Sequence, residues 1–245
     1  MTGLGTIVNV AAVLMGSLIG LITHNALPEK LRDSLMKALG AAVMFIGIGN
    51  TLAEMLTVGE DGKLGTQGIM LMIFSLLFGT IAGELIDIED KLEKLGDKIK
   101  NLNLFGNSGK FSEGFVTSTL LISVGAMAIV GSIRDGINHD PSMLYSKAIL
   151  DFVSTMVFAS TLGVGVVFSA FPMGIYQGAI TVLAALLGEH FMPDTMVSDL
   201  SLVGSVLIFC IGINMFFGKK VKAGNMLPSL LVPIIYGVAK AIIAR

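Results

Sequence analysis

One acidic side chain lies inside a long apolar run of this sequence. Asp151 falls in the first third of the segment at residues 144–168, with Ser154 and Thr155 within helical reach. A charge inside a bilayer is costly, so it usually faces a cavity or a partner. One interpretation is therefore a protonatable or cation-binding carboxylate that lines a path. The other is a structural ion pair with Lys147, which precedes Asp151 by one helical turn.

Two further carboxylates end apolar runs. Glu84 directly follows Gly83, and Glu189 directly follows Gly188, at matched positions in two stretches of similar sequence. Such a pair could act as the gate or coupling carboxylates of a path. The two side chains could also cap the ends of their helices at the lipid headgroups, where a carboxylate costs little. The pattern favours this second role.

Asparagines close two glycine-rich stretches. Asn50 follows Gly47 and Gly49, and Asn214 follows Gly212. Glycine weakens a helix, so such a stretch could unwind and offer backbone carbonyl groups to a solute or ion. Glycine also lets two helices approach closely while an asparagine forms a hydrogen bond across the contact. The composition favours this packing role.

Tyr176 and Gln177 follow Pro172 at the start of the least regular apolar segment. A segment interrupted by proline and glycine is the best pointer to a binding site in a membrane-protein sequence, although an ordinary tight turn has the same appearance. In a path of this kind, we expect the lining to comprise Asp151, Asn9, Asn50, Asn214, Ser154, Tyr176 and Gln177.

The residue types do not indicate metal binding, disulfide formation or enzymatic catalysis. The 15 methionines are scattered, and the 3 histidines share no helix face, so we expect neither a metal site nor a cofactor. A single cysteine, Cys210, excludes an internal disulfide. The sequence lacks a phosphate-binding loop, a nucleophile elbow and a zinc-protease helix. We therefore expect no enzyme and no binding to nucleic acid.

The elements that must position these residues are apolar helices. Hydrophobic residues make up 53% of the 245 residues and charged residues only 14%, against about a quarter in a soluble protein. About 20 apolar residues cross the hydrocarbon core as a helix. The expected fold class is all-α, a polytopic transmembrane helix bundle with spans at 4–23, 35–57, 66–87, 113–133, 144–168, 172–190, 198–217 and 225–243.

The basic residues predict the orientation of these eight spans. Eleven Lys and Arg residues lie on one side, and five lie on the side that holds the N-terminus. Cytoplasmic loops are enriched in Lys and Arg, so we expect the basic loops inside the plasma membrane and the N-terminus outside. If 144–168 and 172–190 are instead one span and a re-entrant segment, seven spans remain. The segment at 88–102 has an apolar and a lysine-rich face, which predicts an amphipathic helix at the headgroups.

Similar short blocks recur along the chain, at residues 13–20, 76–83 and 182–188. We interpret residues 66–168 and 172–243 as two repeat units, with residues 4–57 as a partial extra copy. Each unit would hold three spans, and an odd number of spans places the next copy upside down. Inverted repeats of this kind frame the central site of many secondary transporters.

Several blocks also resemble a known family. They are GTIVN at 5–9, VGAMAIVGS at 124–132, KAILD at 147–151, FASTLGVG at 158–165 and YQG at 176–178. On these residues, nearly the whole chain resembles the prokaryotic membrane family known as domain of unknown function 554, the YqgA/YdfK type. The resemblance implies an integral plasma-membrane protein of a bacterium or archaeon, and it implies no activity.

We expect a single integral membrane domain over residues 1–245 that acts as a small secondary transporter or channel-like permease for a small solute or ion. The alternative is a non-transporting membrane sensor or assembly scaffold that binds lipid or a partner protein. A transporter needs a polar path, whereas a scaffold pairs every polar group in its interior. Membrane lipids are expected partners in both cases, and the short cavity wall of so small a chain is compatible with a homo-oligomer.

Overall fold

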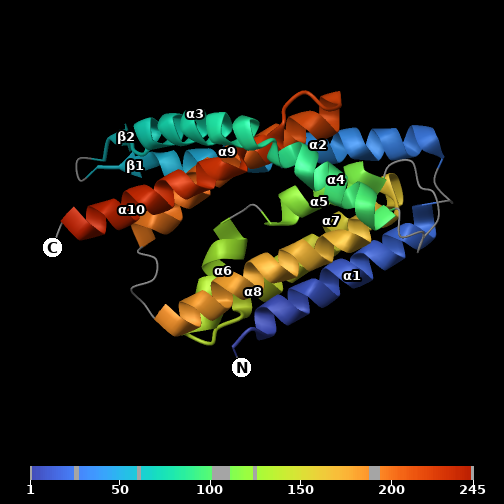
Figure 1. Ribbon diagram of the computed structural model, residues 1–245, viewed down its shortest axis with the longest axis horizontal. Coiled ribbons are helices and arrows are strands. Elements are labelled where there is room, and N and C mark those ends of the chain that lie inside the picture. Colours follow the sequence, from blue (N-terminus) through green and yellow to red (C-terminus); the bar gives the residue numbers. More distant parts are fainter. Residues whose placement is uncertain are drawn as a thin grey trace. The chain divides into compact units, whose positions relative to one another are not determined.

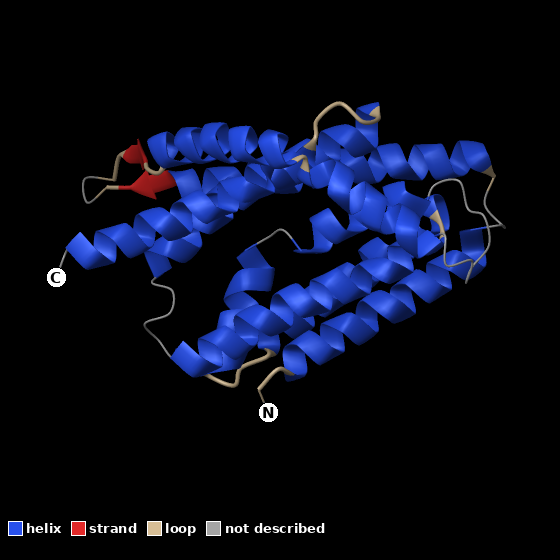
Figure 2. Ribbon diagram, viewed as in Figure 1, coloured by secondary structure: helices blue, strands red, loops and turns tan. Residues whose placement is uncertain are grey.

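The computed structural model describes residues 2–24, 28–59, 62–100, 111–123, 126–187 and 194–243. These residues are almost all helical, with one antiparallel hairpin of β1 (Leu56–Val58) and β2 (Leu64–Thr66) (Figure 1 and Figure 2). The helices are α1 (Leu4–His24), α2 (Glu29–Met55), α3 (Ile69–Ile86), α4 (Ile88–Lys100), α5 (Phe111–Ser123), α6 (Ala126–Ile137), α7 (Ser142–Leu162), η1 (Val164–Ser169), α8 (Ala170–Leu187), α9 (Asp194–Phe217), η3 (Ala223–Leu230) and α10 (Leu231–Ile243), where η marks a 3₁₀ helix. The expected all-α fold class is confirmed.

The chain folds into two compact units, each assembled from distant parts of the sequence. The first unit comprises Met1–Leu39 and Asp90–Phe191, and the second comprises Gly40–Glu89 and Met192–Arg245. In the first unit, α1 packs along α7 and also contacts α8, while α6 packs on α8. In the second unit, α3 packs mainly on η3, and α9 contacts α3, η3 and α10.

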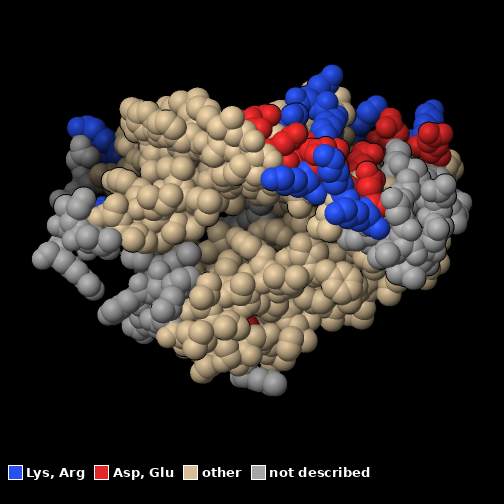
Figure 3. Space-filling view, viewed as in Figure 1, with Lys and Arg blue, Asp and Glu red and all other residues tan. Residues whose placement is uncertain are grey.

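Most of the expected spans are present as long apolar helices. Six helices within the described ranges are long and apolar enough to cross a membrane, or seven spans result if the pair of α5 and α6 forms one. This pair covers the span expected at 113–133, and it is bent by 57°. The segment expected as an amphipathic helix at 88–102 is α4. Figure 3 shows charged side chains gathered over α4, whereas the visible flanks of α3 and α8 are almost free of charge.

The segment expected as an eighth span differs from the prediction. Residues 225–243 contain most of the 3₁₀ helix η3, followed by α10, which has only 13 residues. At 1.5 Å per residue, α10 covers about 20 Å, less than the hydrocarbon core of about 30 Å. Pro228 lies inside η3 and lacks the backbone N–H group that a continuous α-helix would use.

The chain also breaks earlier than expected between α7 and α8. The sequence places this break at residues 169–172, but α7 ends at Leu162 and Gly163 has φ 83° and ψ −154°. Only glycine adopts this backbone conformation readily. The six residues of η1 follow, and Pro172 then lies in the first turn of α8, where proline is tolerated.

The side chains of α3 show why these helices suit lipid. Its buried residues are Ser75, Gly79 and Gly83, which recur every four positions on one face. Large apolar side chains point outward, and Phe78 and Leu85 are 60% and 83% exposed. A helix of a water-soluble protein has the reverse arrangement, with its apolar face buried. Small residues inside and large apolar residues outside are typical of a helix that packs in a membrane.

Glycines allow direct contact between backbones in both units. A Cβ atom added to Gly83 would overlap the carbonyl oxygen of Asn225 in η3, and one added to Gly79 would overlap the backbone of Ser229. In the first unit, Cβ atoms on Gly16 and Gly20 of α1 would overlap carbonyl oxygens of α7. The two Gly-x3-Gly patterns therefore act in helix association, as their spacing predicts.

Each unit contains the same succession of elements. In the first unit α7, η1 and α8 follow one another, and in the second α9, η3 and α10 do so. Proline is the third residue of the last helix in both, as Pro172 and Pro233. This likeness relates residues 142–187 to residues 194–243. The inverted repeat of 66–168 and 172–243 stays a prediction.

Replacement of Gly83 tests the close approach of α3 and η3. We expect Gly83→Ala to lower the free energy of unfolding by about 1–3 kcal/mol. The added methyl group would overlap the backbone carbonyl group of Asn225, which cannot move away as a flexible side chain can. Unfolding in mixed detergent micelles, followed by circular dichroism, measures the change. Gly49→Ala is the control, because Gly49 is exposed on α2 and its Cβ would meet nothing, so alanine should be neutral or stabilise by up to about 1 kcal/mol. Equal losses in the two variants would contradict the packing.

Candidate functional site

A buried ion pair lies in the first unit. Lys147 and Asp151 lie one turn apart on α7, and Lys147 Nζ contacts Asp151 Oδ2. The two residues are only 6% and 7% exposed. Removal of two charges from water is costly, and the attraction between them offsets this cost only if further hydrogen bonds are made.

Asn9 of α1 supplies such hydrogen bonds. Its Nδ2 donates to Asp151 Oδ2 at 3.0 Å and to Gln177 Oε1 at 3.2 Å. Gln177 belongs to α8, so α1 meets the distant helices α7 and α8 at this point. Asn9 and Gln177 are both fully buried. We refer to Lys147, Asp151, Asn9 and Gln177 as the polar cluster.

The close contact of α1 with α7 makes the polar cluster feasible. Asparagine and aspartate have short side chains, so they meet only where the two backbones are near each other. Gly16 and Gly20 provide this approach, because their missing side chains leave room for the backbone of Phe152 and Met156. Thr155, one turn beyond Asp151, donates to the Asp151 carbonyl oxygen at 2.7 Å and lies 3.4 Å from that of Val13.

The polar cluster leaves two buried atoms without a partner. Asn9 Oδ1 and Gln177 Nε2 form no hydrogen bond. The first is an acceptor and the second a donor. Buried polar atoms in folded proteins nearly always have partners, so each exception needs an explanation, such as a bound water, ion or solute. The polar cluster can therefore bind a small group that both donates and accepts hydrogen bonds.

Polar contacts continue from the cluster toward the N-terminal end of α1. The hydroxyl groups of Thr6 and Thr181 lie 3.4 Å apart, and the Gly5 N–H donates to Asp135 Oδ2 at 3.1 Å. Asp135 is fully buried on α6. Sequence analysis missed this carboxylate because the expected span ended at residue 133, whereas α6 continues to Ile137. The available signal was an aspartate close to the end of an apolar run.

The other predicted path residues lie elsewhere. Ser154 and Tyr176 are partly buried in the first unit, and the hydrogen bonds of Asn9 go to Asp151, Met173 and Gln177 instead. Asn50 is exposed on α2, in the second unit, and Asn214 also belongs to that unit. Glu189 lies outside the described residues.

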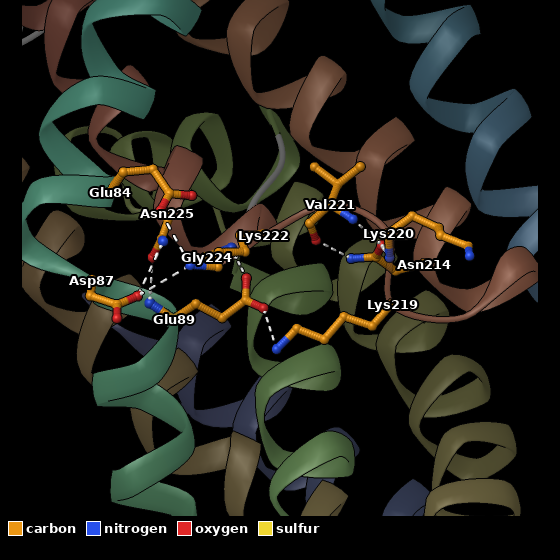
Figure 4. A network of polar contacts seen from close by, with 10 residues as sticks. All are labelled: Glu84, Asp87, Glu89, Asn214, Lys219, Lys220, Val221, Lys222, Gly224 and Asn225. Atoms are coloured by element: carbon orange, nitrogen blue, oxygen red, sulfur yellow. Dashed lines mark hydrogen bonds and ion pairs between the residues drawn. The ribbon is translucent and has the colours of Figure 1, made fainter.

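Asn214 ties a loop to the end of α9. Its Nδ2 donates to the Val221 carbonyl oxygen at 2.6 Å, and its Oδ1 accepts from the N–H groups of Lys220 and Val221 at 2.8 and 2.9 Å (Figure 4). This asparagine therefore satisfies backbone groups in the turn that follows a helix. These bonds differ from the hydrogen bond between two helices that the composition favoured.

Glu89 joins the start of α4 to η3. Its carboxylate, 8% exposed, accepts from the Gly224 N–H at 2.9 Å and pairs with Lys219 at 2.8 Å (Figure 4). Its own N–H donates to Asn225 Oδ1 at 2.7 Å, and Asn225 Nδ2 donates to Asp87 Oδ1 at 3.3 Å. These bonds hold the connection between α3 and α4 against the 3₁₀ helix.

Glu84 lies beside this network in the last turn of α3. Its side chain is 47% exposed, and its Oε2 accepts a hydrogen bond from Lys222 at 3.2 Å. The hydrogen bond from Lys222 to Glu84, together with the negative charges of Glu84 and Asp87, raises the pKa of the Lys222 ammonium. An exposed pair at a helix end is the arrangement expected of a carboxylate at the headgroups.

The described side chains form no conventional metal centre. Within the described ranges, no three His, Cys, Asp or Glu side chains gather in a way that could hold a metal ion. Such sites use several nitrogen, sulfur or carboxylate ligands. The buried polar groups described in the first unit include the ion pair of Lys147 and Asp151, amide groups, hydroxyl groups and the carboxylate of Asp135.

Comparison with known proteins agrees with the membrane fold. The family described as "Protein of unknown function (DUF554)" matches residues 4–238. The chain belongs to this family. It is 32% identical over 229 residues to "Uncharacterized membrane protein YdfK" of Bacillus subtilis (strain 168), covering 94% of this chain and 93% of the relative. It is 31% identical over 235 residues to "Uncharacterized protein YqgA" of Escherichia coli (strain K12), covering 94% of each. No solved structure gives a significant match.

Loss of one partner of the buried ion pair should be costly. Lys147→Met leaves Asp151 without its counter-charge, and we expect the free energy of unfolding to fall by about 3–5 kcal/mol. Lys37→Met is the matched control, because the pair of Lys37 and Asp33 has the same spacing but is 54% and 67% exposed. Its loss should change the free energy by less than about 1 kcal/mol. Unfolding in detergent measures both, and similar losses would show that burial of the pair is unimportant.

A second comparison tests the network of the second unit. Glu89→Gln weakens the contacts with Gly224 and Lys219 in a buried place, so the free energy of unfolding should fall by about 1–3 kcal/mol. Glu84→Gln should cause a smaller loss, because Glu84 is half exposed. Thermal unfolding of both variants in one detergent provides the measurement. A larger loss from Glu84→Gln would reverse this assignment of roles.

Proposed function

We propose that the protein is a small permease or secondary transporter for a small solute or ion. The observation that carries the proposal is the pair of unpartnered atoms in the polar cluster, Asn9 Oδ1 and Gln177 Nε2. In a cluster that only stabilised the fold, every polar atom would have a hydrogen-bond partner, because an unpartnered polar group in a membrane costs free energy. A path for a solute instead keeps unpartnered donor and acceptor atoms that can form hydrogen bonds with the passing solute.

The two 3₁₀ helices support the same function. η1 has 6 residues and η3 has 8, which is longer than most 3₁₀ helices. At membrane depth, irregular backbone is tolerated where it is buried in protein or lines a water-filled cavity. In secondary transporters, interrupted helices of this kind frame the binding site.

Within this proposal, the residues of the polar cluster have distinct roles. Asn9 and Gln177 form hydrogen bonds with the solute through their unpartnered atoms. Asp151 orients the Asn9 amide, and Lys147 balances the charge of Asp151, so that an approaching solute meets a neutral but strongly polar wall. We place the protein in the plasma membrane, with the basic connections in the cytoplasm and the N-terminus outside.

The alternative function, a membrane sensor or scaffold, has one specific observation in its favour. The charges of Lys147 and Asp151 neutralise each other, so this pair could serve the fold alone. A scaffold of this kind would bind lipid or a partner protein through its exposed apolar faces and would leave membrane permeability unchanged.

Solute flux distinguishes the two functions. Purified protein is reconstituted into liposomes, and volume changes after an osmotic step are followed by light scattering with small neutral solutes and with sodium and potassium salts. We expect at least one solute to cross faster than in empty liposomes. Asp151→Asn should abolish this flux, because the neutral side chain accepts a weaker hydrogen bond from the Asn9 amide and leaves Lys147 without its counter-charge.

Two further variants make the flux assay specific. Gln177→Met keeps the volume of the side chain but removes the unpartnered donor, so flux should fall while the protein elutes as the wild type does. Asp33→Asn, an exposed change on α2, should leave flux intact. Wild-type permeability no higher than that of empty liposomes across the whole panel would reject the permease and favour the scaffold.

A further inference from the structure

Asp135 is a fully buried carboxylate that has no ion-pair partner among the described residues. Its Oδ2 accepts one hydrogen bond, from the Gly5 N–H, while its Oδ1 has no partner. The ion pairs formed within the described part of the chain do not include Asp135. A buried charge is normally paired or coordinates a metal ion. Inside a membrane protein, such a residue is by default a candidate functional site.

The dipoles of the helices that end near Asp135 do not neutralise its negative charge. The N-terminus of α1 offers partial positive charge through Gly5, which satisfies one oxygen of the carboxylate. Asp135 itself lies in the last turn of α6, where the helix dipole places partial negative charge. The two effects oppose each other, so the carboxylate still needs a positive charge.

Charged side chains on the packed helices do not supply it. On α7, Lys147 is already paired with Asp151. The described residues of α8 contain only Tyr176 as a titratable group, and those of α1 contain only His24, at the far end of that helix. Arg134, the neighbour of Asp135 on α6, is exposed.

Residues next to Asp135 and Gly5 on the packed helices carry other oxygen atoms. Ser132, one turn before Asp135 on α6, is fully buried and its Oγ has no partner. The hydroxyl groups of Thr6 and Thr181 make only one long contact with each other, at 3.4 Å. Gly136 directly follows Asp135, and a Cβ atom there would lie 2.5 Å from the Thr181 carbonyl oxygen. Carboxylate, hydroxyl and carbonyl oxygens are the ligands of hard cations.

We propose that Asp135 and Ser132 form a binding site for a monovalent alkali cation beside the N-terminal end of α1. A single carboxylate is neutralised by one positive charge, and the buried Asp135 Oδ1 and Ser132 Oγ are oxygen atoms that have no other hydrogen-bond partner. Thr6, which contacts Thr181 of α8, lies on α1 between Gly5 at this site and Asn9 of the polar cluster. The cation is then the transported or coupling ion of the permease. Only this last role rests on the proposed function.

Equilibrium binding of radioactive sodium, and of rubidium in place of potassium, tests the site. The detergent-purified full chain is used, with N-methylglucamine as the inert cation at constant ionic strength. We expect saturable binding of one of the two ions by the wild type. Asp135→Asn should lose it, because asparagine can still accept from Gly5 but carries no charge. Asp33→Asn, on the exposed surface of α2, should bind as the wild type does.

Ser132→Ala keeps the test decisive if Asp135→Asn fails to fold. This variant removes one unpartnered hydroxyl group and little volume, so affinity should weaken by about tenfold while elution from size-exclusion chromatography stays unchanged. No saturable binding by the wild type, or unchanged binding by Asp135→Asn or Ser132→Ala, overturns the proposal. Binding without flux in liposomes would retain the cation site and reject the permease, whereas flux without binding would do the reverse.

Discussion

A polar group of this protein that leaves water loses free energy unless it finds a partner inside the protein, and the rest of the structure depends on that constraint. Lipid offers no hydrogen bonds, so the spanning backbone is helical. The contacts between helices cannot depend on apolar burial alone, since lipid is equally apolar. Small residues such as Gly16 and Gly83 therefore let backbones touch, and the close approach of α1 and α7 brings the short side chains of Asn9 and Asp151 together.

The two units meet this constraint in different ways. In the second unit, Glu89, Asn214 and Asn225 bind backbone groups at the ends of helices, where a carboxylate or amide completes the local structure. In the first unit, polar side chains lie fully buried between helices, and Asn9, Gln177 and Asp135 each keep one atom unpartnered. A network that is completely bonded rigidifies a fold. A network with open atoms retains the capacity to bind something else. Among the described residues, the second unit leaves only the hydroxyl groups of Ser75 and Ser229 without a partner, whereas the first unit leaves amide and carboxylate atoms open, and for this reason function is proposed for the first unit.

Prediction from sequence succeeded where the relevant interaction is local. The pair of Lys147 and Asp151 follows from a spacing of four residues on one helix, and the amphipathic face of α4 follows from its periodicity. Gln177 was selected because it follows Pro172 in an irregular apolar segment, and Asn9 as part of the expected path, but the contacts of Asn9 with Asp151 and Gln177 were not foreseen. Asn50 was selected because it closes a glycine-rich stretch, and it is exposed on α2. Asp135 was missed because the end of α6 was placed four residues too early. Helix ends depend on caps and tertiary contacts, which hydropathy does not report.

The sequence by itself determined that this is a helical membrane protein, because apolar runs of about 20 residues with few charges have no other stable state than a helix in lipid. It also determined which face of α3 carries small residues, since periodicity assigns side chains to faces. Only the tertiary structure decided which faces meet. The contact of α1 with α7 and α8 joins Asn9 to residues more than 140 positions away, and no local pattern distinguishes one small-residue face from another as its partner. The break at Gly163 was also decided there, because a glycine fits both a helix and a turn until its neighbours select one.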